Sequence, residues 1–126
     1  MVRISPEPID TETAYGLIAK NSAGSVVFHY AVVKPQAGPG GTTCYIDYAV
    51  SGDAEAELRT IADELAAKFT VEDTLLIRRT GRLGLGEIIS LVAVSSPNSE
   101  DAFEACKQGI SRLRKMKTIV KNEVCE

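Results

Sequence analysis

The chain has 126 residues, of which 44% are hydrophobic and 25% are charged, and its formal net charge at pH 7 is −3. This length and composition predict a single globular domain, residues 1–126, with one hydrophobic core. No segment reaches the ~18 consecutive apolar residues of a membrane-spanning helix, and no secretory signal is recognisable, so we expect a cytoplasmic protein. The three cysteines are far apart and lack a CxxC pair, which argues against a zinc site or a disulfide framework.

The first half of the sequence predicts three strands and two helices. Strands are expected at residues 2–4, 25–34 and 43–50, the last two dense in β-branched and aromatic residues. A first helix is expected from Asp10 or Thr11, either of which can cap it, to about residue 19. A second is expected from Asp53 to about residue 69, because apolar residues recur there at helical spacing. The Pro/Gly-rich segment 35–42 is incompatible with helix or sheet and is predicted to be a mobile loop.

The second half predicts three strands and a third helix. A strand at 74–79 is followed by a tight, glycine-punctuated connection at 81–86 and by a long strand at 87–95. That long strand is apolar on both faces, so we expect it in the centre of the sheet. Asn98 or Ser99 can cap the third helix, and a short strand at 118–124 closes the chain. The buried stripe of this helix is expected to comprise Phe103, Cys106, Ile110 and Leu113.

The order β-α-β-β-α-β-β-α-β predicts an α/β fold of the α+β type, with helices packed on a mixed sheet. The glycines between 81 and 86 lie between two strands and not before a helix, so they are not a nucleotide-binding loop. The single histidine, His29, lies in the middle of a strand without a second histidine or paired carboxylates nearby. We therefore interpret His29 as structural, and Cys106 as a core residue on the apolar stripe of its helix.

Charge is distributed unevenly along the chain. Residues 1–77 hold 5 Lys/Arg against 11 Asp/Glu, whereas residues 78–126 hold 9 against 6. Basic residues of the second part could form a solvated helix end, or bind an anionic substrate, an acidic partner or a second copy of the chain. The negative overall charge and the lack of aromatic residues among the cations argue against a nucleic-acid-binding protein. The candidate cations are Arg78, Arg79, Arg82, Arg114, Lys115, Lys117 and Lys121.

In order and spacing, several short motifs resemble those of the MoaE family, the large, catalytic subunit of molybdopterin synthase. The resemblance covers nearly the whole chain, and each motif alone is weak. The motifs are Gly24-Ser25-Val26-Val27 before the predicted loop, Arg78-Arg79-Thr80-Gly81, Gly86-Glu87-Ile88, Ala102-Phe103-Glu104-Ala105, Leu113-Arg114 and Lys121-Asn122-Glu123. The resemblance implies an α/β hammerhead fold with an additional small β subdomain.

The resemblance also implies a function. Members of this family accept sulfur from the C-terminal thiocarboxylate of MoaD, a small ubiquitin-fold subunit whose Gly-Gly tail enters the large subunit. The sulfur is added to cyclic pyranopterin monophosphate during molybdenum cofactor biosynthesis, without a metal or other cofactor at this step. The large subunit forms a homodimer, so the assembly is a heterotetramer. The implied catalytic residues are Lys121, Arg114, Lys115 and Lys117, and the implied substrate-binding residues are Lys34, Arg78, Arg79, Asn98 and Ser99.

The sequence departs from the family pattern at functional positions. Arg114 stands in place of the family's key lysine, and arginine keeps the charge but cannot exchange a proton at neutral pH. Asn98 and Ser99 stand in place of a His-Arg pair, and Lys34 in place of an arginine. Two hypotheses follow: a working, divergent synthase subunit, or a catalytically impaired MoaE paralogue that acts as a dimeric binding module for a MoaD-like or other acidic partner.

Overall fold

The computed structural model describes residues 1–125, which form two sheets and three helices. In chain order the elements are β1 (Val2–Ser5), α1 (Thr11–Leu17), β2 (Ser25–Val32), β3 (Ala37–Gly38), β4 (Gly41–Val50), α2 (Ala54–Lys68), β5 (Asp73–Arg79), β6 (Gly81–Gly84), β7 (Ile88–Ser96), α3 (Ser99–Arg114) and β8 (Ile119–Cys125). None of these helices has the length and apolar character needed to cross a bilayer.

The main sheet has the strand order β1-β5-β7-β2, with β1 parallel to β5 and the other neighbours antiparallel. Helices α2 and α3 pack on one face, around Leu76, Val92 and Val94, and α1 packs on the other, around Leu75 and Leu91. The central place of β7 confirms the expectation drawn from its two apolar faces. The mixed α/β fold class is confirmed as well.

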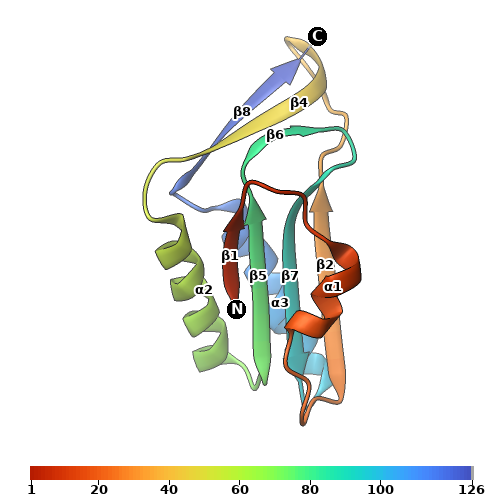
Figure 1. Ribbon diagram of the computed structural model, residues 1–126, viewed down its shortest axis with the longest axis vertical. Helices are drawn as coiled ribbons and strands as arrows, with labels where there is room; N and C mark the ends of the chain where they lie inside the picture. Colours follow the sequence, from red (N-terminus) through yellow and green to blue (C-terminus); the bar gives the residue numbers. More distant parts are fainter. Residues whose placement is uncertain (126) are drawn as a thin grey trace.

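A small second sheet lies beyond one end of the main sheet, at the top of Figure 1. Strand β4 is the central strand of this sheet, because β6 pairs with one edge of β4 and β8 with the other. Its inner face packs against the main body through Ile46, Tyr48 and Leu83, all at most 6% exposed. This is the additional β subdomain that the resemblance implied.

Three expectations from the sequence were wrong in detail. The predicted loop 35–42 contains the two-residue strand β3, which pairs with the start of β4; its mobility stays a prediction. The glycine-punctuated connection contains β6, because Gly81 with a φ of +95° turns the chain immediately after β5 and lets residues 81–84 pair with β4. Phe103, expected in the core, is 62% exposed.

Helix α3 lies close to the main sheet at Gly109. A β-carbon added to Gly109 would lie 2.9 Å from Val92 Cγ1 and 3.3 Å from Leu65 Cδ1. Both neighbours are core residues at most 1% exposed, so neither has open space into which to move. The absence of a side chain at Gly109 therefore sets the distance between α3 and β7.

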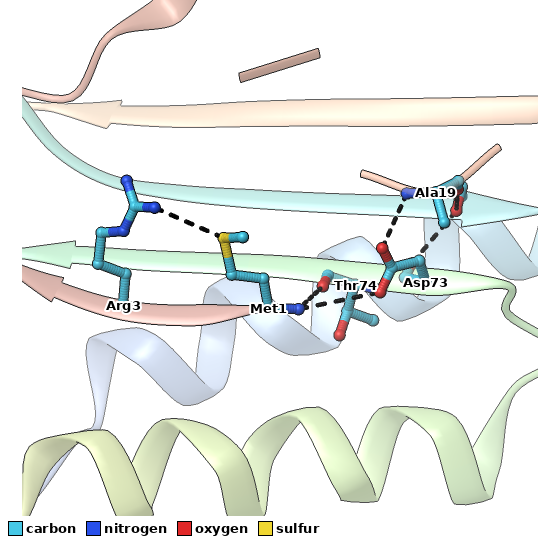
Figure 2. A network of polar contacts seen from close by, with 6 residues as sticks. Met1, Arg3, Ala19, Asp73 and Thr74 are labelled. Carbon is cyan, nitrogen blue, oxygen red and sulfur yellow. Dashed lines mark hydrogen bonds and ion pairs between the residues drawn. The ribbon is translucent and has the colours of Figure 1, made fainter. Parts of the chain in front are cut away.

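The amino end of the chain is held beside β5 by polar contacts (Figure 2). The Met1 amino nitrogen donates a 2.8 Å hydrogen bond to the Thr74 carbonyl and lies 3.9 Å from a carboxylate oxygen of Asp73. The other carboxylate oxygen of Asp73 accepts a 2.8 Å hydrogen bond from the Ala19 amide. Asp73 therefore links β1, β5 and the segment after α1 at one edge of the main sheet.

Glu57 in α2 fixes the start of β8. Its carboxylate accepts hydrogen bonds from the amides of Lys117 and Thr118 and from the Thr118 hydroxyl, at 2.6–3.1 Å. Burial raises the pKa of the Glu57 carboxyl, but these hydrogen bonds outweigh burial, so the pKa lies below its ordinary value. The segment between α3 and β8 is thereby tied to the body of the protein, and this sets where β8 begins.

Candidate functional site

A hollow of about 660 Å³ lies where the two sheets and the end of α3 meet. One wall comes from the end of β2 and the residues after it, a second from β4 and β8, and a third from the last turn of α3. The ends of β5 and β7 contribute Arg78 and Ser90 to its lining. These segments are far apart in the sequence, so the hollow is a product of the tertiary fold.

Four cations line the hollow, each from a different part of the chain: Lys34, Arg78, Arg114 and Lys121. Lys121 lies opposite Tyr48 in the β8–β4 register. The alternation of side chains along a strand places Ile119, Lys121 and Glu123 on one face of β8, and all three line the hollow. The structure thus brings together four of the nine residues that the sequence had suggested for the site.

Glu123 is the one carboxylate that lines the hollow within residues 1–125. It accepts a hydrogen bond from the Thr43 hydroxyl and lies 3.4 Å from Lys121 Nζ. The Thr43 hydrogen bond lowers the pKa of the Glu123 carboxyl, and the Lys121 ammonium adds to this effect although burial opposes it. Glu123 therefore remains anionic near neutral pH and orients Lys121, and the hollow keeps an excess of positive charge.

Arg78 is the most buried of the four cations, with 8% of its surface exposed, whereas the other three are exposed residues. Its guanidinium lies over the Tyr48 ring, with Cζ 4.4 Å from the ring centroid. Burial lowers the pKa of Arg78, and Tyr48 partly offsets this. Among residues 1–125 no carboxylate forms an ion pair with Arg78, and its Nε has no hydrogen-bond acceptor.

Arg79, the neighbour of Arg78 on β5, is not among the residues that line the hollow. Its Nη1 donates a 2.7 Å hydrogen bond to Glu87 Oε1, and Glu87 Oε2 accepts one from the Gly84 amide. The Arg79 hydrogen bond lowers the pKa of Glu87, and the Gly84 amide adds to the effect. Arg79 thus ties the end of β5 to the turn between β6 and β7.

Lys115 and Lys117 follow α3 but do not line the hollow. Lys115 lines a second, more apolar hollow of about 570 Å³ between β2 and α3, together with the exposed Phe103. Lys117 is exposed, and its backbone amide is bound to Glu57. The expectation that either lysine shares a site with Lys121 within one chain is not supported by these positions.

Asn98 and Ser99 lie at the opposite end of α3 from Arg114. Asn98 caps the helix by accepting a 2.8 Å hydrogen bond from the Asp101 amide, and the Ser99 hydroxyl bonds the Ser25 hydroxyl at 2.8 Å. A 16-residue helix is about 24 Å long. Asn98 and Ser99 therefore cannot reach the hollow of their own chain.

Polar residues of the hollow that sequence reasoning missed include His29, Tyr48 and Glu123. Tyr48 shares a face of β4 with Ile46, but nothing in the sequence paired that face with Lys121. Glu123 was detectable in principle, since it lies two residues after Lys121 on the same strand and so on the same face. His29 lines both hollows and has a buried Nδ1 without a partner among residues 1–125.

The free thiols offer no comparable site. Cys106 is 3% exposed in the core beneath α3, and burial raises the pKa of its thiol to about 11. This confirms the expectation that Cys106 is a core residue. Within residues 1–125 no three His, Cys, Asp or Glu side chains lie close enough together to hold a metal ion.

Comparisons with known proteins found a matching family model and similar sequences. The family model described as MoaE protein matches residues 4–116. The chain is 34% identical to the molybdopterin synthase catalytic subunit of Staphylococcus aureus strain COL over 124 residues, covering 98% of this chain and 83% of that protein. It is 30% identical to the protein of the same name from Pyrococcus abyssi over 121 residues, covering 96% and 82%.

Solved structures match as well. The crystal structure of molybdopterin synthase from S. aureus superimposes with a TM-score of 0.89 at 33% identity, covering 98% of this chain and 90% of that chain. A complex of subunits 1 and 2 of the molybdopterin-converting factor from Helicobacter pylori matches with a TM-score of 0.70 at 14% identity, covering 99% and 85%. At that identity the second match supports the fold alone.

Proposed function

Because this chain belongs to the MoaE family, we propose that it is the large subunit of a molybdopterin synthase in molybdenum cofactor biosynthesis. In this proposal it transfers sulfur from the C-terminal thiocarboxylate of a MoaD-like subunit to cyclic pyranopterin monophosphate. The observation that supports the proposal is the hollow lined by four cations and by one carboxylate, Glu123, which is bound to Thr43 and Lys121. The proposed reaction needs no metal or organic cofactor.

Each anionic group of the reaction has a counterpart in the hollow. A phosphate and a terminal thiocarboxylate or carboxylate are bound well by guanidinium and ammonium groups through charge-assisted hydrogen bonds. We assign substrate binding to Lys34 and Arg78, and stabilisation of the negative charge that develops during transfer to Arg114 and Lys121. Lys121 is the one of the four with a direct carboxylate partner on its own strand, Glu123, which holds its ammonium in place.

Arg114 favours a second candidate function. It occupies the position of the family's key lysine, and a guanidinium does not exchange protons at neutral pH. If sulfur transfer requires a proton at that position, the chain binds a MoaD-like or other acidic tail in the same hollow without catalysis. This would make it an impaired paralogue that acts as a binding module.

A turnover assay separates the two functions. The purified protein, mixed with a thiocarboxylated MoaD-like subunit and cyclic pyranopterin monophosphate, is expected to produce molybdopterin. The Arg114→Lys variant is expected to react at a similar or higher rate because it restores a proton donor. If the parent makes no product but Arg114→Lys does, the chain is a binding module. An authentic large subunit, active under the same conditions, serves as the positive control. If that control is active and neither protein makes product, the enzyme proposal is wrong.

We further propose that the chain assembles with a small subunit and with a second copy of itself. The small-subunit partner is suggested by the H. pylori neighbour, which was solved as a complex of two subunits. The second copy is suggested by the apolar hollow beside the exposed Phe103 and by the distance between the two ends of α3. Antiparallel packing of two α3 helices would carry Asn98 and Ser99 of one copy toward Arg114 of the other.

The homodimer has a direct test. Sedimentation at micromolar concentration is expected to give the mass of two chains. Phe103→Glu should shift the protein toward monomer, because a carboxylate placed in an apolar interface must lose its hydration. Glu104→Gln, one residue further along α3, serves as a control for a change of charge. A monomeric parent at these concentrations would contradict the proposed assembly.

A further inference from the structure

We infer that Arg78 forms a built-in oxyanion subsite at the innermost part of the hollow, and that its ligand is a carboxylate or a phosphate monoester. Arg78 is buried but lacks a counter-ion among residues 1–125. Arg78 is 8% exposed, yet within residues 1–125 its guanidinium has no carboxylate partner and its Nε has no acceptor. It also lines the hollow in which three other cations lie.

An unpaired buried guanidinium is costly to the folded protein. Removing an ion from water carries a penalty that only a counter-ion or several hydrogen bonds can offset. The penalty is visible in the lowered pKa of Arg78, for which burial is the main cause. The Tyr48 side chain, whose ring centroid lies 4.4 Å from Arg78 Cζ, offsets part of it, but a tyrosine is a weaker partner than a carboxylate. The folded protein alone therefore leaves Arg78 without an adequate partner.

Two neighbouring arginines show how this chain satisfies a guanidinium that has a structural role. Arg79 is 9% exposed and donates through Nη1 to Glu87 at 2.7 Å, so its charge has a carboxylate partner although its Nε, like that of Arg78, has no acceptor among residues 1–125. Arg82 lies over Tyr45 at 3.9 Å, much as Arg78 lies over Tyr48, but also donates to both carboxylate oxygens of Asp47 at 3.0 and 3.3 Å. Only Arg78 of these three lines the hollow, and it is the one without a carboxylate.

The shape of the group indicates its ligand. A guanidinium presents a planar fork of N–H donors that matches two oxygens of one carboxylate or phosphate. The stacked Tyr48 ring covers one face of this fork, so ligands are expected to approach its edge. Lys34, Arg114 and Lys121 are exposed residues of the same hollow, so a ligand held by Arg78 would lie deeper than one held by these three.

This inference deepens the proposed function and rests on it for the natural source of the anion. The two sources are the terminal carboxylate of a partner's glycine-ended tail and the phosphate of the pterin substrate. Both can present two oxygens of one group to the Arg78 guanidinium. The experiment separates them with two probes: inorganic phosphate, and acetyl-glycylglycine as a model of the tail.

The experiment measures the affinity of the full chain for each probe by calorimetry, and the thermal midpoint without either probe. Arg78→Met keeps the aliphatic stem and removes the charge. It is expected to weaken binding of at least one probe by roughly tenfold to a hundredfold, the usual effect of losing a hydrogen-bonded charge. The probe affected identifies the source of the anion, and an effect on both shows that the subsite accepts either. Arg82→Met removes a stacked but paired guanidinium and should change both affinities less than about twofold.

Stability gives the second readout. Without probe, Arg78→Met should unfold at the same temperature as the parent or higher, because it removes an uncompensated buried charge. Arg79→Met should unfold at a lower temperature, because it leaves Glu87 without its partner. Unchanged affinity for both probes in Arg78→Met would overturn the inference. So would a lower midpoint or failure to fold, because either would mean that the guanidinium is structural.

These outcomes are independent of catalysis. A parent that binds a probe through Arg78 but makes no molybdopterin would defeat the enzyme proposal and leave the subsite standing. A parent that makes molybdopterin while Arg78→Met binds both probes as tightly as before would defeat the subsite alone.

Discussion

Replacement of Lys121 by methionine is expected to lower the rate of sulfur transfer by roughly a hundredfold to a thousandfold, the usual cost of removing a fixed group that stabilises developing negative charge. Lys121 has this role in the proposal because β8 directs it into the hollow opposite Tyr48, and because Glu123 holds its ammonium at 3.4 Å. The measurement is single-turnover formation of molybdopterin at saturating MoaD-like subunit, which separates the transfer step from binding.

Lys68→Met is the matched control for this variant. Lys68 is an exposed lysine in the last turn of α2 whose Nζ donates to Gln108, and it does not line the hollow. The control removes the same charge from the same residue type, and its rate should stay within about twofold of the parent. A Lys121→Met protein that turns over as fast as Lys68→Met would remove Lys121 from the mechanism.

The second large effect is expected at Gly109. Gly109→Ala should lower the free energy of unfolding by about 1–3 kcal/mol, because the new methyl group would overlap Val92 in a fully packed core. Val92 is β-branched and has few alternative rotamers, so the clash is relieved only by moving α3 away from β7. Gly109→Val adds two more carbons at the same place and should cost more. Urea denaturation followed by circular dichroism measures both values.

Gly16→Ala controls for the intrinsic preference of helices for alanine. Gly16 lies in α1, and a β-carbon added there meets nothing within 4 Å. This substitution should raise the free energy of unfolding by up to about 1 kcal/mol. If the free energy of unfolding falls in Gly109→Ala but rises in Gly16→Ala, packing is the cause of the loss at Gly109. Equal effects would mean that α3 does not pack on β7 as described.

Much of the fold was predictable because its signals are local. Asp10 and Asn98 were identified as candidate helix caps and Asp53 as the start of the second helix. Each accepts a hydrogen bond from a backbone amide in the first turn of its helix. The apolar stripe of α2 and the continuous apolar run of β7 both lie in the core. The missed elements, β3 and β6, are short and glycine-rich. They are strands because they pair with β4. Pairing with a strand that is distant in the sequence produces no recognisable pattern in the local sequence.

The site was only partly predictable for the same reason. Lys34, Arg78, Arg114 and Lys121 were selected by charge and motif, and the fold brings all four to one hollow. Charge alone could not separate Arg78 from Arg79, although one lines the hollow and the other is paired with Glu87. Phe103 was misplaced because helical periodicity identifies a stripe but not its width. Its neighbours Ala102 and Ala105 are fully buried instead.

The pairing of β4 with β8 has a consequence for synthesis of the protein. It joins residues about 70–80 positions apart, from Val50 with Ile119 to Thr43 with Cys125. Such distant contacts are slow to form because loop-closure entropy must be paid first, and β8 leaves the ribosome after β4 and α3. Until then the growing chain has Lys34, Arg78 and Arg114 but neither Lys121 nor the part of the second wall that β8 supplies. The complete hollow therefore forms only after β8 has been synthesised and has paired with β4.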